Sequence, residues 1–371
     1  MKLTTEQLRA LPDPKRRAIE DELAAWIRAD AQANALVYYR VVNPDAVKLH
    51  LSTAREFGVQ GGRRSSKTAT MLAEGAIRMT GELPRAFAVC CVCQAPMARR
   101  SSGGWDHTTP ADDGHPGVLR YPVAKLKPPI RVRLVVTSNV NAWDENLKQK
   151  LQYSQWNGRL NEHELPGDPR CGHWGFIPQR FLFNGSWDDS WSERHRKLTL
   201  NLHGDGGTAP GSTMVVMSHQ QALEDFNQGF YDLILEDEIP PEEIHRANKI
   251  RTLDLRGQVI TGGTPPDERP DAVAAAWFFD QILSPGLAGA NPERVEAVVL
   301  WTEHNQTLDP TEVEAIGQGL TPDERRAIFH GESLHLSGLV IRGFTEKVRQ
   351  WCARCNAVLS LGLEGCPECG G

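Results

Sequence analysis

No run of apolar residues in this 371-residue chain is long enough to cross a bilayer, which argues against a membrane-spanning protein. The polar, helix-patterned residues 1–30 do not resemble a secretion signal. The chain lacks the excess of basic residues found in many nucleic-acid-binding proteins, since its formal net charge is −6. A DNA partner would therefore have to bind a local basic patch. We therefore expect an intracellular protein whose eight cysteines are metal ligands or buried thiols before they are disulfides.

One glycine is missing from an otherwise recognisable motif. The segment "GGRRSSKT" follows the phosphate-loop pattern G-x-x-x-x-G-K-[ST], except that Ser66 stands where the last glycine should be. Serine is the smallest polar alternative, so we expect the loop to survive the substitution. The competing interpretation is a glycine-rich turn with an exposed lysine. As a phosphate loop, the segment predicts nucleotide contacts at Gly61, Gly62, Ser65, Ser66, Lys67 and Thr68, with Thr68 also binding Mg²⁺.

A second motif lies about 170 residues further on. In "LILEDE" (233–238) an apolar run ends in acids, as a Walker B strand does. Asp237 would hold Mg²⁺, and Glu238 would orient and deprotonate the attacking water. The two motifs in this order predict an enzyme that hydrolyses ATP. Arg63 and Arg64 lie inside the loop, where one of them could stabilise the transferring phosphoryl group or pair with an acid and hold the loop in shape.

Strand and helix patterns alternate along the chain, which predicts an α/β fold of the P-loop NTPase (RecA/ASCE-like) class with a mostly parallel central sheet flanked by helices. We expect a helical N-terminal segment (1–45), an ATPase domain (46–335) with a surface insertion at 94–129, a linker (336–350) and a cysteine-rich tail (351–371). Helices are predicted within 5–35, 67–79, 244–257 and 270–283, and strands within 57–60, 86–93, 130–138, 175–186, 212–219, 230–238, 258–265, 295–305 and 338–344.

The tail carries the pattern C-x2-C, ten residues, C-x2-C. Each C-x2-C pair presents two thiolates to one ion, so the four cysteines predict a small zinc ribbon; a rubredoxin-like iron site and two disulfides are the alternatives. We expect the ribbon to dock to DNA or to a partner protein. Its proposed ligands are Cys352, Cys355, Cys366 and Cys369.

The other four cysteines leave two interpretations open. Cys90 and Cys93 have the same C-x2-C spacing, and His107, His115 and His173 could complete a second metal site. Alternatively "AFAVCCVC" (86–93) is a buried strand that uses cysteine as a small hydrophobic residue; the role of Cys90, Cys91, Cys93 and Cys171 stays open.

The ordered set of motifs resembles the large terminase subunit, the ATP-driven DNA-packaging motor of tailed bacteriophages. "NPDAVKLHLSTAREFGVQGGRRSSKT" is similar to the family's adenine-binding segment and arginine-containing phosphate loop, and "NGS" followed by "LILEDEIP" is similar to its Walker B region. "QVITGGTPP" resembles the coupling motif that links hydrolysis to movement, which places Thr264 and, one residue out of the usual register, Thr261 in that role.

The resemblance implies cofactors and partners. The chain would use ATP and Mg²⁺, form a homo-oligomeric ring, pentameric when assembled, and move double-stranded DNA into a procapsid. Its other partners would be the portal protein and the small terminase subunit, in the host cytoplasm and without membrane contact. Arg246 and Arg251 are candidates for an arginine that acts on a neighbouring subunit.

One departure from the family concerns the C-terminal nuclease. That domain builds its metal site from several separated acids, whereas the residues after Phe344 contain only Glu346, Glu364 and Glu368. We expect no nuclease activity in this chain. Two other functions share the nucleotide motifs: a superfamily 2-like helicase, for which the chain after Pro265 is too short to hold a second lobe, and a nucleotide-binding scaffold that does not hydrolyse ATP.

Overall fold

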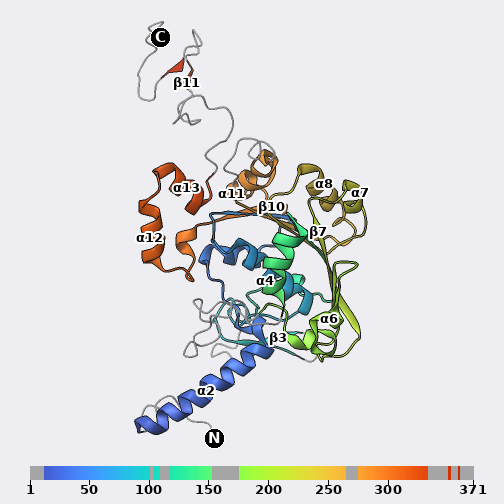
Figure 1. Cartoon of the computed structure of the whole chain (residues 1–371), viewed down its shortest axis with the longest axis vertical. Helices are drawn as coiled ribbons and strands as arrows, with labels where there is room; N and C mark the ends of the chain where they lie inside the picture. Colours follow the sequence, from blue (N-terminus) through green and yellow to red (C-terminus); the bar gives the residue numbers. More distant parts are fainter. Residues whose placement is uncertain are drawn as a thin grey trace.

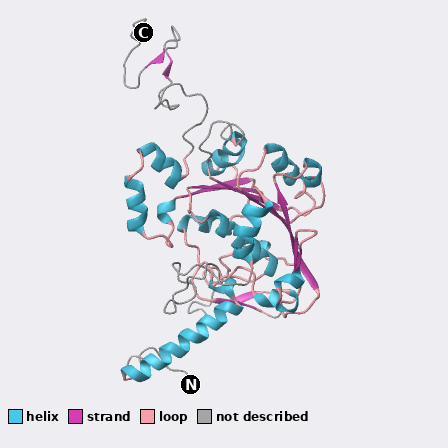
Figure 2. Cartoon of the chain, viewed as in Figure 1, coloured by secondary structure: helices cyan, strands magenta, loops and turns pink. Residues whose placement is uncertain are grey.

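The computed structural model describes residues 12–100, 104–108, 117–152, 175–264, 275–332, 350–351 and 358–359. An eight-stranded sheet with strand order β10-β1-β9-β8-β4-β7-β6-β5 forms its centre (Figures 1 and 2). These strands are β1 (Glu56–Gly61), β4 (Arg131–Val136), β5 (Trp191–Ser192), β6 (Lys197–Asn201), β7 (Pro210–Ser218), β8 (Leu233–Asp237), β9 (Gln258–Gly263) and β10 (Val295–Leu300).

The helices alternate with these strands along the chain. They are α2 (Asp13–Ala33), α3 (Val47–Leu51), α4 (Lys67–Thr80), α5 (Lys148–Leu151), α6 (Trp187–Ser190), α7 (Leu223–Phe226), α8 (Glu242–Ile250), α10 (Ala276–Phe278), α11 (Ser284–Ala288), α12 (Pro310–Gln318) and α13 (Pro322–His330). Shorter 3-10 turns join them. One π-helical stretch, Asn139–Leu147, precedes α5, and another, Phe279–Leu283, precedes α11. No helix among the described residues is long and apolar enough to span a membrane.

The prediction of a mostly parallel sheet is confirmed. Each neighbouring pair from β10 through β7 is parallel, whereas the two pairs at one edge, β7 with β6 and β6 with β5, are antiparallel. The strand that enters the phosphate-loop segment, β1, and the strand that ends in the acids, β8, lie on either side of β9. Parallel strands end at the same edge of a sheet, so the carboxyl ends of β1, β9 and β8 meet in one place.

Helix α4 packs on one face of the curved sheet, and α7, α8, α10 and α11 cover the other (Figures 1 and 2). Alternate residues of β1 show this division: Phe57 and Val59 join the core around α4, while a side chain at Gly58 would meet Phe278 and Ile282 on the opposite face. Gly81 caps the end of helix α4. Its left-handed conformation, with φ 72°, allows its N–H to donate to Ile77 O.

A buried polar cluster fixes α4 to its surroundings. The fully buried Glu74 accepts hydrogen bonds from Arg78, Tyr121 and His50, and Lys125 lies 2.6 Å from the same carboxylate. Burial raises the pKa of Glu74, but the nearby cations outweigh it and hold that pKa well below its usual range. Tyr121 and Lys125 lie within the 94–129 insertion, so the end of that insertion packs into the core, whereas we expected the insertion to lie on the surface.

Two predicted strands are wrong. Residues 86–93 form turns closed by isolated bridges, Val89 to Pro96 and Cys90 to Leu119, because Cys90–Cys93 fold into a tight turn. Residues 175–186 form 3-10 turns (Gln179–Phe181 and Phe183–Gly185), in which the left-handed Asn184 breaks the extended pattern. The predicted strand at 338–344 lies outside the described residues.

The insertion and the tail each contribute a small hairpin. Strand β2 (Met97–Arg99) pairs with β3 (Trp105–His107), and β11 (Gln350–Trp351) pairs with β12 (Val358–Leu359) on either side of residues 352–357. The four tail cysteines, like Cys171, His115 and His173, lie outside the described residues. The zinc ribbon and the domain bounds therefore stay predictions.

Candidate active site

The phosphate-loop segment runs from the carboxyl end of β1 to the first turn of α4. The first N–H groups of a helix have no carbonyl partner within the helix, and the helix dipole adds partial positive charge there. This placement suits a phosphate group, because the sheet edge aims the loop and the helix supplies the unpaired donors.

Both opening glycines are required by close packing. A side chain at Gly61 would lie 2.4 Å from Leu300 O, and one at Gly62 would lie 2.4 Å from both Ile328 O and Phe329 O. The loop is therefore pressed against the end of β10 and the last turn of α13, where only glycine fits.

Side chains from behind the loop hold three successive carbonyl oxygens. Thr302 Oγ1 donates to Arg63 O (2.6 Å), Asn305 Nδ2 donates to Arg64 O (2.6 Å), and Asn43 Nδ2 donates to Ser65 O (3.2 Å). In a trans peptide the carbonyl oxygen and the following N–H point in opposite directions. The N–H groups of Arg64 and Ser66 consequently face the open side of the loop, as in an anion-binding nest, while the N–H of Ser65 donates to Gly62 O (3.3 Å).

The backbone at Ser66 explains why a glycine is expected there. Ser66 adopts the left-handed conformation, with φ 77° and ψ 11°, and Arg64 has a φ of 63°. A side chain in this region crowds the neighbouring carbonyl, at a cost of roughly 1–2 kcal/mol. The serine is thus accommodated with strain. The hydroxyl oxygens of Ser65 and Ser66 are buried and make no hydrogen bond within the described structure, so both are free to receive a ligand.

Lys67 lies across the loop and is 8% exposed. Its Nζ donates to Gly61 O and Gly62 O, both at 2.9 Å. Burial lowers the pKa of Lys67, and the carboxylates of Glu238 and Asp237 oppose that change. The ammonium group of Lys67 is therefore held at the loop by two hydrogen bonds to backbone oxygens, which a phosphate group could replace.

Thr68 and Asp237 meet across the edge of the sheet. Thr68 Oγ1 donates a 2.6 Å hydrogen bond to Asp237 Oδ1, although the two residues are 169 positions apart. Burial raises the pKa of the Asp237 carboxyl to about 6, against the lowering effect of the Thr68 hydroxyl. A hydroxyl and a carboxylate in contact beside a phosphate loop are the oxygen ligands that Mg²⁺ prefers.

Glu238 follows the end of β8 in a left-handed conformation, with φ 73°. Its Oε2 accepts a 3.1 Å hydrogen bond from the backbone N–H of Thr264, just after β9. The predicted catalytic base and the predicted coupling residue are therefore in direct contact. Non-glycine residues at positive φ are uncommon and cluster at functional sites.

Thr261 lies apart from this contact. Its Oγ1 donates to Glu236 Oε2 (2.6 Å), a fully buried carboxylate that also accepts from His245 Nδ1 (2.9 Å) and Asn248 Nδ2 (2.8 Å). Burial lowers the pKa of His245, but Glu236 and Glu56 outweigh it and raise that pKa to about 9. Sequence reasoning missed Glu236 and His245; the available signal was Glu236 itself, the first of the three acids in "LILEDE".

A cation near the acids was also missed. Lys150, on α5, lies close enough to Asp237 and Arg64 for their charges to affect its pKa, which burial lowers overall. The spacing of a four-residue helix gives no sign of this role. Arg63 and Arg64 are exposed on the loop, whereas Arg246 pairs with Glu242 on α8 (2.6 Å).

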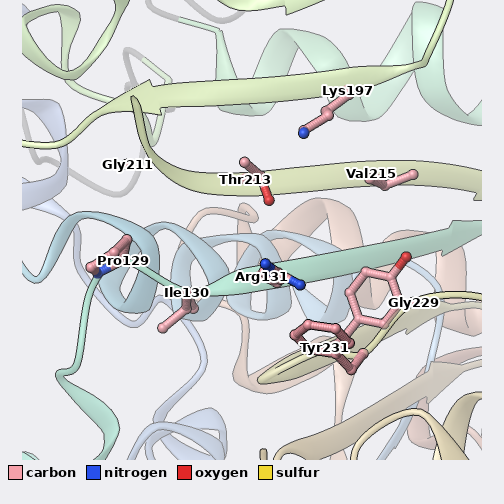
Figure 3. Close-up of a pocket in the computed structure, with 10 residues that line it drawn as sticks. Pro129, Ile130, Arg131, Lys197, Gly211, Thr213, Val215, Gly229 and Tyr231 are labelled. Atoms are coloured by element: carbon pink, nitrogen blue, oxygen red, sulfur yellow. The ribbon is translucent and has the colours of Figure 1, made fainter. Parts of the chain in front are cut away.

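A second feature is a groove of about 500 Å³ on the sheet face opposite α4. Arg131, Lys197 and Thr213 line it from three adjacent strands, with Phe230 beneath Arg131 at 4.1 Å (Figure 3). An adjoining groove extends it past Arg194 and contains one carboxylate, Asp225. Among the described residues, no carboxylate forms an ion pair with Arg131, Lys197 or Arg194.

No family model and no curated protein matches the chain. Among solved structures, two of the large terminase of the thermophilic bacteriophage D6E, one of them in complex with ADP, are similar to this chain at 11% identity, with TM-scores of 0.41 and 0.43. They match 81% and 86% of this chain, which spans 52% and 56% of theirs. The large-terminase ATPase domain of a Thermus phage is 12% identical, with a TM-score of 0.42, over 80% of this chain and 95% of that domain. The chain thus has structural matches to phage large-terminase ATPase domains over about four-fifths of its length.

Proposed function

We propose that the chain is the ATP-hydrolysing subunit of a DNA-packaging motor. The observation that carries the proposal is the contact of Thr68 with Asp237 beside Lys67, because it joins the two nucleotide motifs in one place. The spare hydroxyls of Ser65 and Ser66 and the outward N–H groups of Arg64 and Ser66 fit a triphosphate.

The residues divide the work of phosphoryl transfer. Lys67 would exchange its bonds to Gly61 O and Gly62 O for phosphate oxygens, and Thr68 and Asp237 would hold Mg²⁺. The ion supplies charge neutralisation at the β- and γ-phosphates. Arg63, Arg64 or Lys150 would stabilise charge on the transferred group.

Glu238 would accept the proton of the attacking water. Because the Glu238 carboxylate accepts a hydrogen bond from the N–H of Thr264, a change in the charge or position of Glu238 would alter that bond at the end of β9. We propose this bond as the first step by which hydrolysis reaches the rest of the subunit, with Thr261 holding the strand through Glu236.

The DNA partner is proposed to contact the groove lined by Arg131, Lys197 and Thr213, together with its extension past Arg194; we call this surface the basic groove. Its three cations, Arg131, Lys197 and Arg194, form no ion pair within the described part of the chain and line the groove together with threonine and glycine, which suits phosphate contacts without base readout. The ring, the portal protein, the small terminase subunit, the zinc tail, and the placement in the host cytoplasm belong to the same proposal and follow from the sequence resemblance.

A triplex-displacement assay tests the motor against its alternatives. A motor on double-stranded DNA should displace a third strand with ATP and leave the duplex intact. Separation of the duplex strands would instead support the helicase. Nucleotide binding with neither hydrolysis nor displacement, in wild type and in Glu238→Gln alike, would support the scaffold.

A further inference from the structure

The tight turn at Cys90–Cys93 has the backbone of a metal-binding knuckle. Cys90 N–H donates to Ala95 O (2.9 Å) and Gln94 N–H donates to Cys90 O (3.0 Å), which closes the turn. Gln94 then takes a left-handed conformation with φ 59°. This geometry turns two side chains three positions apart toward the same point.

The neighbouring hairpin brings a histidine to that point. Strands β2 and β3 pair Met97 with His107, and His107 Nε2 lies 3.4 Å from Cys93 Sγ. The ligand atoms of Cys90, Cys93 and His107 all lie within 4.8 Å of one another. In a tetrahedral zinc site, with Zn–S near ~2.3 Å and Zn–N near ~2.0 Å, a sulphur and a nitrogen ligand are about 3.6 Å apart.

We propose that Cys90, Cys93 and His107 bind a zinc ion. Two thiolates and one imidazole favour zinc over the hard cations, which prefer oxygen. A tetrahedral ion requires a fourth donor, which these three residues do not supply. The site is separate from the four cysteines of the tail and from the Mg²⁺ ligands at the phosphate loop.

The surroundings prepare a thiolate at Cys90. Burial raises the pKa of this thiol, but the N–H groups of Cys93, Val118 and Val92, together with His107, outweigh it and lower the pKa to about 6. The thiolate is the form that binds metal.

The ion would hold the insertion against the core. Cys91 N–H bonds Val118 O (2.8 Å) and Arg120 N–H bonds Val89 O (2.8 Å), so the chain returns alongside the knuckle. The next residue, Tyr121, donates to Glu74 on α4 (2.9 Å). Zinc binding here would therefore stabilise the packing on the helix that begins at the phosphate loop, as structural zinc does elsewhere.

Zinc content of the purified full-length chain tests the site. Cys93→Ser should carry one zinc ion fewer per chain than wild type, measured by inductively coupled plasma mass spectrometry. Cys91→Ser is the matched control, since Cys91 lies in the same turn but outside the cluster, and should keep the wild-type content. Equal zinc in wild type and Cys93→Ser would overturn the proposal.

A second measurement does not depend on the folding of Cys93→Ser. In a full chain with all four tail cysteines changed to serine, Co²⁺ should bind at one ion per chain and produce a thiolate charge-transfer band. His107→Ala in that background should weaken Co²⁺ binding at least about 10-fold, and His107→Cys should restore it. The absence of the band in the chain whose four tail cysteines are changed to serine would contradict the site.

Discussion

Thr68 Oγ1 lies 2.6 Å from Asp237 Oδ1, so the first turn of α4 and the end of β8 share a hydrogen bond. The two side chains come from strand–helix units separated by β9 in the sheet. Because both are ligands that suit Mg²⁺, the bond marks where the ion would be held by the two motifs together.

Replacing Thr68 with valine should weaken Mg²⁺ binding while preserving shape. Valine keeps the volume but removes the hydroxyl, so the apparent Mg²⁺ affinity in an ATPase titration should fall at least about 10-fold. Thr68→Ser keeps the oxygen and is the matched control. If Thr68→Val titrates like Thr68→Ser, Thr68 does not contact the ion.

Ser66→Gly should stabilise the chain and keep or raise ATPase activity. Glycine adopts a φ of 77° without crowding, and the change also removes a buried hydroxyl that has no partner in the described structure. We expect a gain of up to about 1 kcal/mol in the free energy of unfolding, measured by urea denaturation. Lys67→Ala should abolish ATPase activity in the same assay. Loss of activity in Ser66→Gly would show that the hydroxyl has a role of its own.

The buried pair of His245 and Glu236 predicts how stability depends on pH. The folded pKa of His245 is about 9, above the unfolded value near ~6.5. The protonated His245 therefore contributes up to roughly 3 kcal/mol to the free energy of unfolding. This contribution is complete below pH ~6.5 and is lost as the pH rises through 9. His245→Gln should flatten the unfolding free energy over this window, whereas the exposed His304→Gln should not. An unchanged slope in His245→Gln would contradict the assignment of the charge.

The basic groove predicts a change in salt dependence. Arg131→Ala and Lys197→Ala should each reduce the slope of log affinity against log salt for double-stranded DNA by about 1, whatever the DNA sequence. Lys15→Ala, on the exposed surface of α2, should leave the slope unchanged. If the control and the groove variants have the same slope, the DNA lies elsewhere.

Much of the sheet was predictable because its strands are apolar runs bounded by glycine or acids, as "LILEDE" illustrates. The two failures, at 86–93 and 175–186, are apolar runs whose tight turns depend on contacts formed elsewhere in the chain. The loop residues were predictable from a motif. The carbonyl-holding Asn43, Thr302 and Asn305 were not, because they come from separate segments and carry no spacing signal.

Phosphate release from ATP by the wild-type chain and by Glu238→Gln, with Mg²⁺ and double-stranded DNA present, tests the central claim most directly. We predict DNA-stimulated release in wild type and at least a ~100-fold lower rate in Glu238→Gln, because glutamine keeps the hydrogen bond to Thr264 but cannot accept the water's proton. Nucleotide binding should be retained in both. Equal rates in the two proteins, or no release from wild type, would contradict the account.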